Sequence, residues 1–341
     1  MSVSVVIVNF RSASLILDAL ESLYRYPQRL LKEVIVVDNA SGDDSEQLIT
    51  QKFPQVKWWQ MDYNAGFARA NNAGIRMATG EAVLLLNPDT IIEDNAIETC
   101  AGRLLRSTHV AAGVQLLHED RSPQISGNFF MKGGLNHLMA VPYSGSILRW
   151  AGLKMQVKST NIPEAVNEVK VDWINGAFLM VKKSAIEKAG LLDEDFFLYS
   201  EEIEWCYRLG KIGTLCIYGD LHVVHLVGVS AGKAFNSTTS GYNQLTDKKG
   251  LQLLLSGWVR IRKQFGIGWF LMHFLFYWAS IPFGYLCAII LGVLKPSTLS
   301  ARMAVMNGFA RNTIKATKYV GKILDNRPYF YKVLYKNMGG Y

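Results

Sequence analysis

A short apolar run that ends in a carboxylate most constrains the fold of this chain. The run Val83–Leu86 is typical of a buried β-strand, because a strand covered on both faces reads as continuous apolar sequence. Pro88 cannot continue the ladder, so Asp89 follows at the strand's carboxyl end, where open α/β sheets bind ligands. A carboxylate there suits Mg²⁺ or Mn²⁺ beside a diphosphate. Taken alone, Asn87-Pro88-Asp89 also fits an ordinary strand-to-turn junction.

Apolar segments with strand and helix periods alternate through the first ninety residues. This alternation predicts an α/β fold with a mostly parallel sheet and helices on both faces. Residues 118–168 show no clear period, so we expect irregular structure that covers an acceptor site. The predicted strands are Val3–Val8, Glu33–Val37, Val56–Met61, Val83–Leu86, 110–117 and Trp173–Val181, and the predicted helices are Ser14–Tyr26, Gly66–Ala78 and one beginning at Ser184.

The length of 341 residues and a hydrophobic content of 50% indicate a folded protein of about two domains. The four cysteines lack metal-binding spacing, and this favours a reduced cytoplasmic setting. The N-terminal residues begin directly with a strand, so no secretory signal is expected.

Positive charge is concentrated after Lys295. From there to Tyr341 nine Lys and Arg face one acid, Asp325, and this difference equals the whole net charge of +8. Nucleic acid is one partner for such a tail. The apolar run Trp269–Leu294 just before it favours an anionic membrane surface instead, so no nucleic-acid partner is expected.

The 26 residues of that run exceed the roughly 20 that a spanning helix needs. Basic residues flank both of its ends, however, and both flanks therefore prefer the cytoplasm. Pro282 and Gly284 divide the run into two segments that are each too short to span. We expect a re-entrant or in-plane helical hairpin, peripheral to the cytoplasmic face of the inner membrane. A single span and a buried soluble or oligomer-forming helix pair are the alternatives.

Several polar residues elsewhere could bind a nucleotide. Asp38 ends the second predicted strand and could accept hydrogen bonds from a base or ribose, or it could cap a helix or turn. Gly66 permits close approach of the backbone, and the helix N-terminus after it suits an anion.

Two acids and a histidine in the second half could carry catalysis. Glu201 and Glu202 stand where the macrodipole favours acids at a helix start, and one of them could instead be a general base for a hydroxyl nucleophile. His225 could form a mixed nitrogen and oxygen metal site with Asp89, although a single histidine is more often structural.

The motifs are more specific in their joint order along the chain than any of them is alone. Across roughly residues 3–265 the chain resembles the family 2 glycosyltransferases, and in particular the rhamnosyltransferase-like branch that builds bacterial surface polysaccharides. The segments that carry this resemblance are VSVVIVNF, VVDNASGD, NAGFARANN, LLLNPDT, WINGAFLMVKKSA, DEDFFLYSEEIEWCYR and HVVHLVGVS.

The resemblance implies a GT-A catalytic domain at residues 1–265, followed by membrane-associated helices and a basic tail at 266–341. It implies a nucleotide-diphospho-sugar donor, dTDP- or UDP-linked, and inversion at the anomeric carbon. Five positions would then line the donor's nucleotide. Asn9 and Asp38 would form the nucleoside pocket, and Asn64, Gly66 and Asn72 would lie beside the nucleotide.

The remaining carried-over positions surround the sugar and the metal. Asn87-Pro88-Asp89 stands where the family has its DxD motif, so Asp89 would be the metal carboxylate, and Asn87 leaves the site with fewer charges. Gly176 and Ala177 would edge the sugar pocket. Glu201-Glu202 stands where the family usually has Glu-Asp, whose second acid is the base, so Glu202 inherits that role beside Glu201. His225 resembles the family's extra metal ligand.

The QxxRW motif of processive members is missing, and this argues for transfer of a single sugar. The predicted activity is a metal-dependent, inverting transfer of rhamnose or a similar sugar to a hydroxyl of a glycan or lipid-linked acceptor. A sugar nucleotidyltransferase is an alternative, but Asn9-Phe10-Arg11-Ser12 lacks the glycines such enzymes usually carry there. A non-catalytic, membrane-attached nucleotide-sugar-binding protein would be favoured if Asp89, Glu202 and His225 were far apart.

Overall fold

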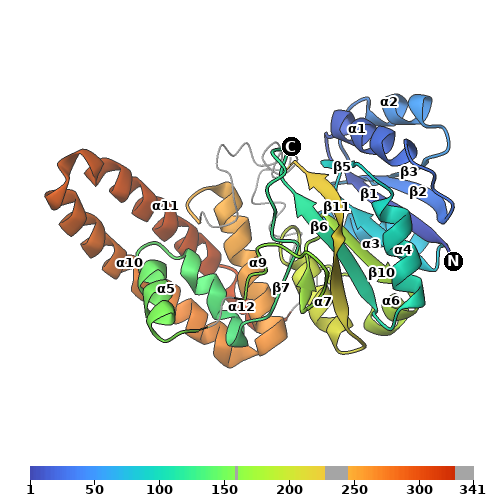
Figure 1. Cartoon of the computed structure of the whole chain (residues 1–341). Coiled ribbons are helices and arrows are strands. Elements are labelled where there is room, and N and C mark those ends of the chain that lie inside the picture. Colours follow the sequence, from blue (N-terminus) through green and yellow to red (C-terminus); the bar gives the residue numbers. More distant parts are fainter. Residues whose placement is uncertain (158–159, 227–244, 327–341) are drawn as a thin grey trace. The chain divides into compact units, whose positions relative to one another are not determined.

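The apolar strands form one mixed nine-stranded sheet, with β8 paired beside the order β3-β2-β1-β4-β10-β6-β11-β5. The computed structural model describes residues 1–157, 160–226 and 245–326 (Figure 1). The strands of this sheet are β1 (Val3–Asn9), β2 (Leu31–Asp38), β3 (Lys57–Gln60), β4 (Ala82–Leu86), β5 (Thr90–Ile92), β6 (Ala111–Leu117), β8 (Glu168–Val171), β10 (Phe178–Lys182) and β11 (Leu215–His225). A second, two-stranded sheet pairs β7 (Gly127–Asn128) with β9 (Trp173–Ile174).

The sheet is parallel in its first half and mixed in its second. The ladders that join β3, β2, β1 and β4 are all parallel, as the alternation of strands and helices predicted. Strand β10 then lies antiparallel to both β4 and β6, and β5 lies antiparallel to β11. The expected α/β fold class is confirmed, and its second half departs from the mostly parallel pattern because β10 enters the sheet in the opposite direction.

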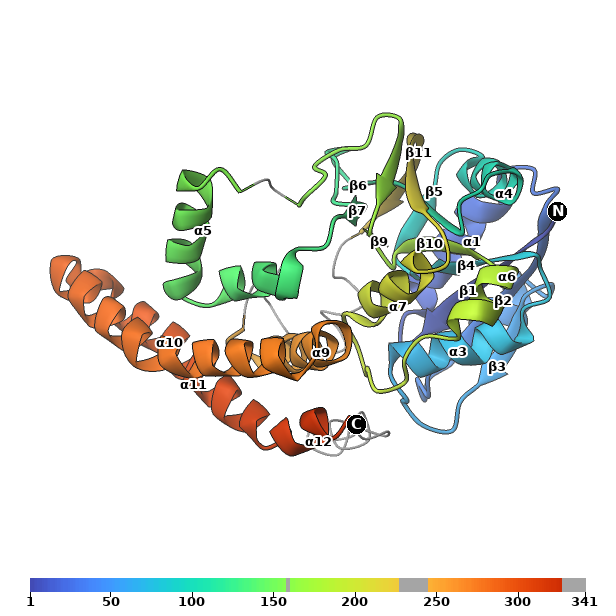
Figure 2. The same ribbon diagram turned by 90° about the horizontal axis from the view of Figure 1, so that it is seen from below.

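Alternate residues of the strands face two separate apolar layers. Val5 and Ile7 of β1 belong to the core with α1 (Ala13–Tyr24), α2 (Ser45–Lys52) and α4 (Ala96–Arg106). Val6 and Val8 belong to the core with α3 (Phe67–Met77), α6 (Lys183–Ala189) and α7 (Glu201–Gly210). This two-residue period therefore gives a sheet with helices on both faces, as both views show (Figures 1 and 2).

The contacts divide the chain into two compact units. The first comprises Met1–Phe129, Asn161–Phe197 and Glu201–Ala234, and it contains the whole sheet. The second comprises Phe130–Thr160, Leu198–Ser200 and Phe235–Tyr341. This division differs from a single boundary after residue 265, because α9 and part of the segment 118–168 join the C-terminal helices. The helices of the second unit are η1 (Lys132–Ala140), α5 (Ser144–Lys154), α9 (Lys248–Phe265), α10 (Ile267–Leu294), η2 (Pro296–Thr298), α11 (Leu299–Thr317) and α12 (Val320–Leu324).

Two expectations for these segments were wrong. Residues 118–168 are not irregular throughout, because η1 and α5 are helical. The apolar run is not broken near Pro282, because α10 continues through it as one 28-residue helix. The hairpin forms instead between α10 and α11, which lie side by side within this unit (Figures 1 and 2). Small residues allow this packing, since a Cβ added at Gly284 would lie 2.5 Å from Cε of Met306.

Among the described helices, α10 alone is long and apolar enough to cross a membrane. The predicted motif residues Gly228 and Ser230, and the basic residues Arg327, Lys332 and Lys336, lie outside the described part of the chain.

Candidate active site

Asp89 and His225 meet at one edge of the sheet. Antiparallel pairing of β5 with β11 aligns His225 with Thr90, and the backbone N–H of Leu226 donates to the carbonyl of Asp89 at 2.9 Å. These ladders place Nε2 of His225 3.5 Å from Oδ1 of Asp89. Both side chains are almost fully buried, at 3% and 1% exposure. The structure therefore brings the two predicted metal ligands together.

A tight turn at residues 175–177 connects this pair with the two acids of α7. The N–H of Asn87 donates to the carbonyl of Ala177 at 3.0 Å, and Nδ2 of Asn87 lies 3.4 Å from Nε2 of His225. One residue earlier, a Cβ added at Gly176 would lie 3.5 Å from Cγ of Glu202. Glu202 and Asn87 thus lie beside successive residues of a single turn.

Glu201 and Glu202 begin α7 in unlike environments. Glu201 is buried, and one of its carboxyl oxygens, Oε2, has no hydrogen-bond partner within the described structure, whereas Glu202 is half-buried. Burial first, and then the charge of Glu202, raises the pKa of Glu201 well above its usual value. The pair is therefore suited to hold one neutral carboxyl group and one carboxylate.

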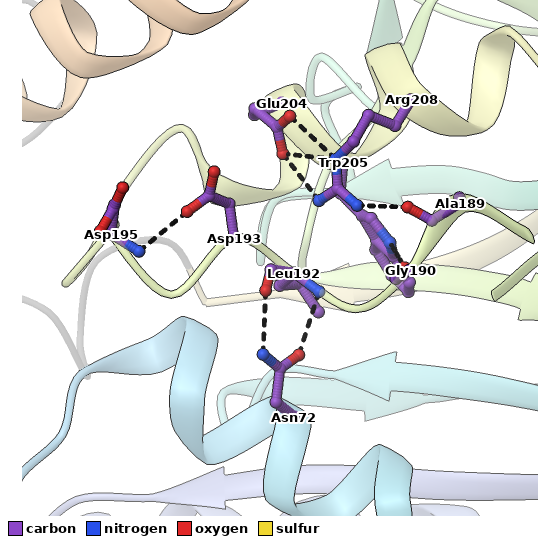
Figure 3. A network of polar contacts seen from close by, with 9 residues as sticks. All are labelled: Asn72, Ala189, Gly190, Leu192, Asp193, Asp195, Glu204, Trp205 and Arg208. Atoms are coloured by element: carbon purple, nitrogen blue, oxygen red, sulfur yellow. Dashed lines mark hydrogen bonds and ion pairs between the residues drawn. The ribbon is translucent and has the colours of Figure 1, made fainter. Parts of the chain in front are cut away.

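Helix α7 is bonded through Trp205 and Arg208 to the segment before residue 193 (Figure 3). The indole N–H of Trp205 donates to the carbonyl of Gly190 at 2.8 Å. The guanidinium of Arg208 donates to the carbonyl of Ala189 at 2.6 Å and to both carboxylate oxygens of Glu204. These bonds fasten α7, which begins with the two acids, to the end of α6.

A buried network surrounds Asp38 at the ends of β1 and β2. The parallel register places Asn9 opposite Asp38, and Nδ2 of Asn9 donates to Oδ1 of Asp38 at 2.7 Å. The N–H of Ser41 and the amide of Gln60 donate to Oδ2 at 2.9 and 2.8 Å. Ser41 and Gln60 were missed at the sequence level. The Asp-x-x-Ser turn would have revealed Ser41, but Gln60 depends on the register of β2 with β3.

Asn64 and Gly66 shape the loop before α3. Oδ1 of Asn64 accepts from Nδ2 of Asn39 at 2.9 Å and from the N–H of Gly66 at 3.1 Å. Gly66 has φ of 86°, and a Cβ there would lie 2.4 Å from the carbonyl oxygen of Phe197. That carbonyl also accepts from the N–H of Phe67. The close backbone approach that Gly66 permits is therefore to Phe197, and the first amide of α3 is already used there.

Asn72 binds groups of the segment before α7 (Figure 3), and its expected place beside the nucleotide stays a prediction. Its Nδ2 donates to the carbonyl of Leu192 at 2.9 Å, and its Oδ1 accepts from the N–H of Leu192 at 3.0 Å. Nδ2 also reaches Glu194 at 3.1 Å, and the residue is completely buried. Because both ends of its amide bind protein groups, Asn72 fastens α3 to the segment before α7.

The donor set at Asp89 fits a divalent ion that keeps other ligands. No group of three or more His, Cys, Asp or Glu able to hold a metal occurs among the described residues. The carboxylate of Asp89 nevertheless suits Mg²⁺ or Mn²⁺, since Mg²⁺ sites commonly use one or two carboxylates together with water and substrate phosphates, and the imidazole of His225 adds a nitrogen ligand.

Sequence comparison relates part of this chain to a known family. Residues 4–152 match the sequence model of glycosyl transferase family 2. The low-salt glycan biosynthesis hexosyltransferase Agl10 of Haloferax volcanii is 27% identical over 284 residues, covering 77% of this chain and 84% of the relative. The N-acetylglucosaminyl-diphospho-decaprenol L-rhamnosyltransferase of Mycobacterium tuberculosis is 25% identical over 229 residues, covering 62% and 72%.

A solved structure agrees in fold. The mannosyltransferase PcManGT from Pyrobaculum calidifontis, in complex with GDP-Man and Mn²⁺, superposes with a TM-score of 0.51 at 15% identity and covers 91% of this chain and 86% of its own. Residues 4–152 thus resemble glycosyl transferase family 2, and the chain has the GT-A fold.

Proposed function

We propose that this protein transfers a single sugar, rhamnose or a similar hexose, from a nucleotide-diphospho donor to a hydroxyl group with inversion at the anomeric carbon. The acceptor is a glycan or a lipid-linked sugar of cell-surface polysaccharide synthesis. The observation that carries this proposal is the contact of Glu202 and of the Asn87-Pro88-Asp89 segment with successive residues of the 175–177 turn. A base and a diphosphate site so arranged can act on one donor and one acceptor.

Glu202 is the base in this proposal. It takes the proton of the acceptor hydroxyl as that oxygen attacks the anomeric carbon from the face opposite the diphosphate. The raised pKa of its buried neighbour supports this assignment, because a neutral Glu201 leaves the negative charge on Glu202. Gly176 supports it as well, since the absence of a side chain there leaves space beside the Glu202 carboxylate.

Asp89 and His225 would hold the divalent ion, Mg²⁺ or Mn²⁺. A bound ion would stabilise the negative charge that develops on the leaving diphosphate. The Asn87 amide, 3.4 Å from Nε2 of His225, helps to orient that ring. Support for the ion also comes from the structural neighbour, whose complex contains Mn²⁺.

Asp38 and Asn9 form the floor of the proposed nucleoside pocket. Their carboxylate and amide are already fixed by Ser41, so base recognition would need little rearrangement. The exposed Gln60, which donates to Asp38, is the group that an incoming base would exchange with. We propose a dTDP- or UDP-linked donor. The mycobacterial relative, whose name specifies rhamnose and a decaprenyl-linked acceptor, supports the choice of sugar and acceptor.

We further propose that the second unit attaches the protein to the cytoplasmic face of the inner membrane. One stripe of α10 is buried, but its other face carries exposed apolar residues, among them Leu286 at 56%, Ile290 at 52% and Val293 at 71%. The short helix α5 exposes Trp150 and Leu153 in the same unit. A water-facing helix normally has a polar outer face, so these surfaces suit a lipid interface.

An in-plane or re-entrant position of the α10–α11 hairpin fits its charges. The helix α10 is about 42 Å long, which exceeds the hydrocarbon core. Its partner α11 carries Arg302, Arg311 and Lys315, which anionic headgroups would bind. The double variant Leu286→Glu/Ile290→Glu should lose binding to phosphatidylglycerol vesicles. Leu48→Glu, at an exposed apolar position of α2, is the matched control and should still bind. Equal vesicle binding by all three proteins would contradict the membrane proposal.

Transfer assays test the proposed activity. Purified protein with Mn²⁺ should release nucleoside diphosphate from dTDP-rhamnose or a UDP-hexose in the presence of a polyprenyl-linked acceptor. Asp89→Ala or excess EDTA should abolish this release and weaken diphosphate binding. Asp220→Asn, an exposed acid on the same strand as His225, should behave as wild type. Full activity of Asp89→Ala would refute the metal assignment.

A further inference from the structure

Gln124 is a buried side chain that contacts the inner nitrogen of His225. It follows β6, where its N–H donates to the carbonyl of Leu116 at 2.8 Å, and only 6% of its surface is exposed. Its Oε1 lies 3.1 Å from Nδ1 of His225. Its Nε2 lies 2.7 Å from the carbonyl oxygen of His225 and 2.9 Å from that of Leu117.

The two carbonyl groups determine how the Gln124 amide is oriented. A carbonyl oxygen can only accept a hydrogen bond, so the group that faces both of them must be the NH₂. The opposite orientation would place three oxygens together, one pair of them 2.7 Å apart. Oε1 must therefore face Nδ1 of His225, and because Oε1 is itself only an acceptor, Nδ1 must carry a proton.

This arrangement determines which nitrogen of His225 can bind a metal. In a neutral imidazole one nitrogen carries the proton and the other keeps a lone pair. With the proton on Nδ1, the lone pair is on Nε2, the atom that lies 3.5 Å from Oδ1 of Asp89. Free histidine favours the other tautomer, with its proton on Nε2, which could not bind a cation at that atom.

We propose that Gln124 is a positioning residue that fixes His225 in the tautomer whose Nε2 lone pair faces Asp89, and thereby prepares the divalent-ion site. Metal-bound histidines commonly donate their second ring N–H to a carbonyl or carboxylate group, and loss of that partner typically costs about 10–100-fold in metal affinity. The amide oxygen of Gln124 is such a partner. This inference rests on the metal site of the proposed function.

Spectroscopy tests the tautomer without any assay of activity. Two-bond ¹H–¹⁵N correlation spectra of protein labelled with ¹⁵N-histidine distinguish the two tautomers, and the spectrum of His225→Asn assigns the signal among the six histidines. The measurement is made with Mg²⁺, which is diamagnetic, at a pH well above the ordinary histidine pKa of about 6.5. We expect the pattern of a ring protonated at Nδ1. A wild-type ring protonated at Nε2 would overturn the proposal.

Two substitutions separate positioning by Gln124 from general stability. Gln124→Met keeps the approximate size but removes the acceptor, and it should weaken Mn²⁺ binding by about 10–100-fold. Gln115→Met is the matched control, because Gln115 is another buried amide, bonded to Leu116, Gln124 and Ala165. It should lose stability but keep the tautomer and the Mn²⁺ affinity.

The results distinguish failure of this inference from failure of the metal site itself. If the wild type and Gln124→Met bind Mn²⁺ equally well, Gln124 has no positioning role and the metal site stands. If the wild type binds no Mn²⁺, the proposed metal site is refuted, and the proposed role of Gln124 is refuted with it. If Gln124→Met does not fold, the tautomer of His225 in the wild type still decides the question.

Discussion

Glutamine substitutions of the two adjacent acids at the start of α7 should have different effects on kcat. Glu202→Gln removes the proposed base and preserves side-chain size. Positioned general-base catalysis contributes about 10²–10⁴-fold, so kcat should fall by that factor, which corresponds to about 2.7–5.4 kcal/mol of activation free energy. The affinity for the donor nucleotide should change little, because the network around Asp38 is held by Asn9, Ser41 and Gln60.

Glu201→Gln should leave kcat nearly unchanged and should stabilise the protein. Burial and the charge of Glu202 raise the pKa of Glu201, so the folded protein binds this proton more tightly than the unfolded chain does. The contribution of such a group to stability is complete below the unfolded pKa of about 4.3 and is lost as pH rises through the raised folded pKa. The gain in the free energy of unfolding on Glu201→Gln should therefore be largest at neutral or alkaline pH and should vanish near pH 4.

The assay combines steady-state kinetics with urea unfolding of the wild type and both variants across pH. A dead Glu201→Gln enzyme beside an active Glu202→Gln enzyme would reverse the two roles. If both acids only favoured the helix start, each substitution would cost about 0.3–1 kcal/mol of stability and kcat would not change. That result would refute the reasoning from the geometry of the 175–177 turn.

Three further changes test residues that hold the fold around the site. Burial raises the pKa of Glu33, but hydrogen bonds from Lys57, Ser4 and Thr79 outweigh it and lower this pKa to about 2. Glu33→Gln should therefore lower the free energy of unfolding by about 2 kcal/mol at pH 7, measured in urea. The difference from wild type should shrink as pH falls from 4.5 towards 2. Asn72→Ala should cost about 2–4 kcal/mol by leaving both backbone groups of Leu192 unbonded, with unchanged affinity for nucleotide in calorimetry. Gly66→Ala should lower the melting temperature, because its Cβ would overlap the carbonyl of Phe197; a melting temperature equal to wild type would contradict the packing reason for this glycine.

The polar residues at the carboxyl edge of the sheet could be predicted from the sequence, because the geometry of parallel strands brings them together. The apolar runs of β1, β2 and β4 each end in a polar residue, and parallel strands place their carboxyl ends together. Asn9 beside Asp38 follows from that register alone. The position of Asp89 beside His225 needed one more fact, the antiparallel pairing of β5 with β11, which no local pattern reveals.

The sequence could not show which asparagines and glycine of the Asn64–Asn72 segment bind a ligand and which hold the fold. Amides are equally suited to a phosphate, a ribose and a backbone. Asn72 meets Leu192, which is distant in sequence, and Gly66 meets Phe197, so their partners become known only when the chain returns to α3. The helical segments had a different difficulty: Pro282 usually ends or kinks a helix, but the packing of α11 against α10 keeps this one continuous.

The protonation of the two reactive groups depends on neighbours that the sequence places far away. Glu201 and Glu202 are identical in type and adjacent in the chain, and burial on one side of α7 alone makes them different. In our proposal the tautomer of His225 is fixed by Gln124, which lies 101 residues earlier in the chain. In both cases the motif supplies the reactive atom, whereas residues outside the motif set its charge state or its lone pair. A sequence can therefore identify Glu202 and His225 as candidates, whereas their proposed roles as base and metal ligand depend on the folded surroundings.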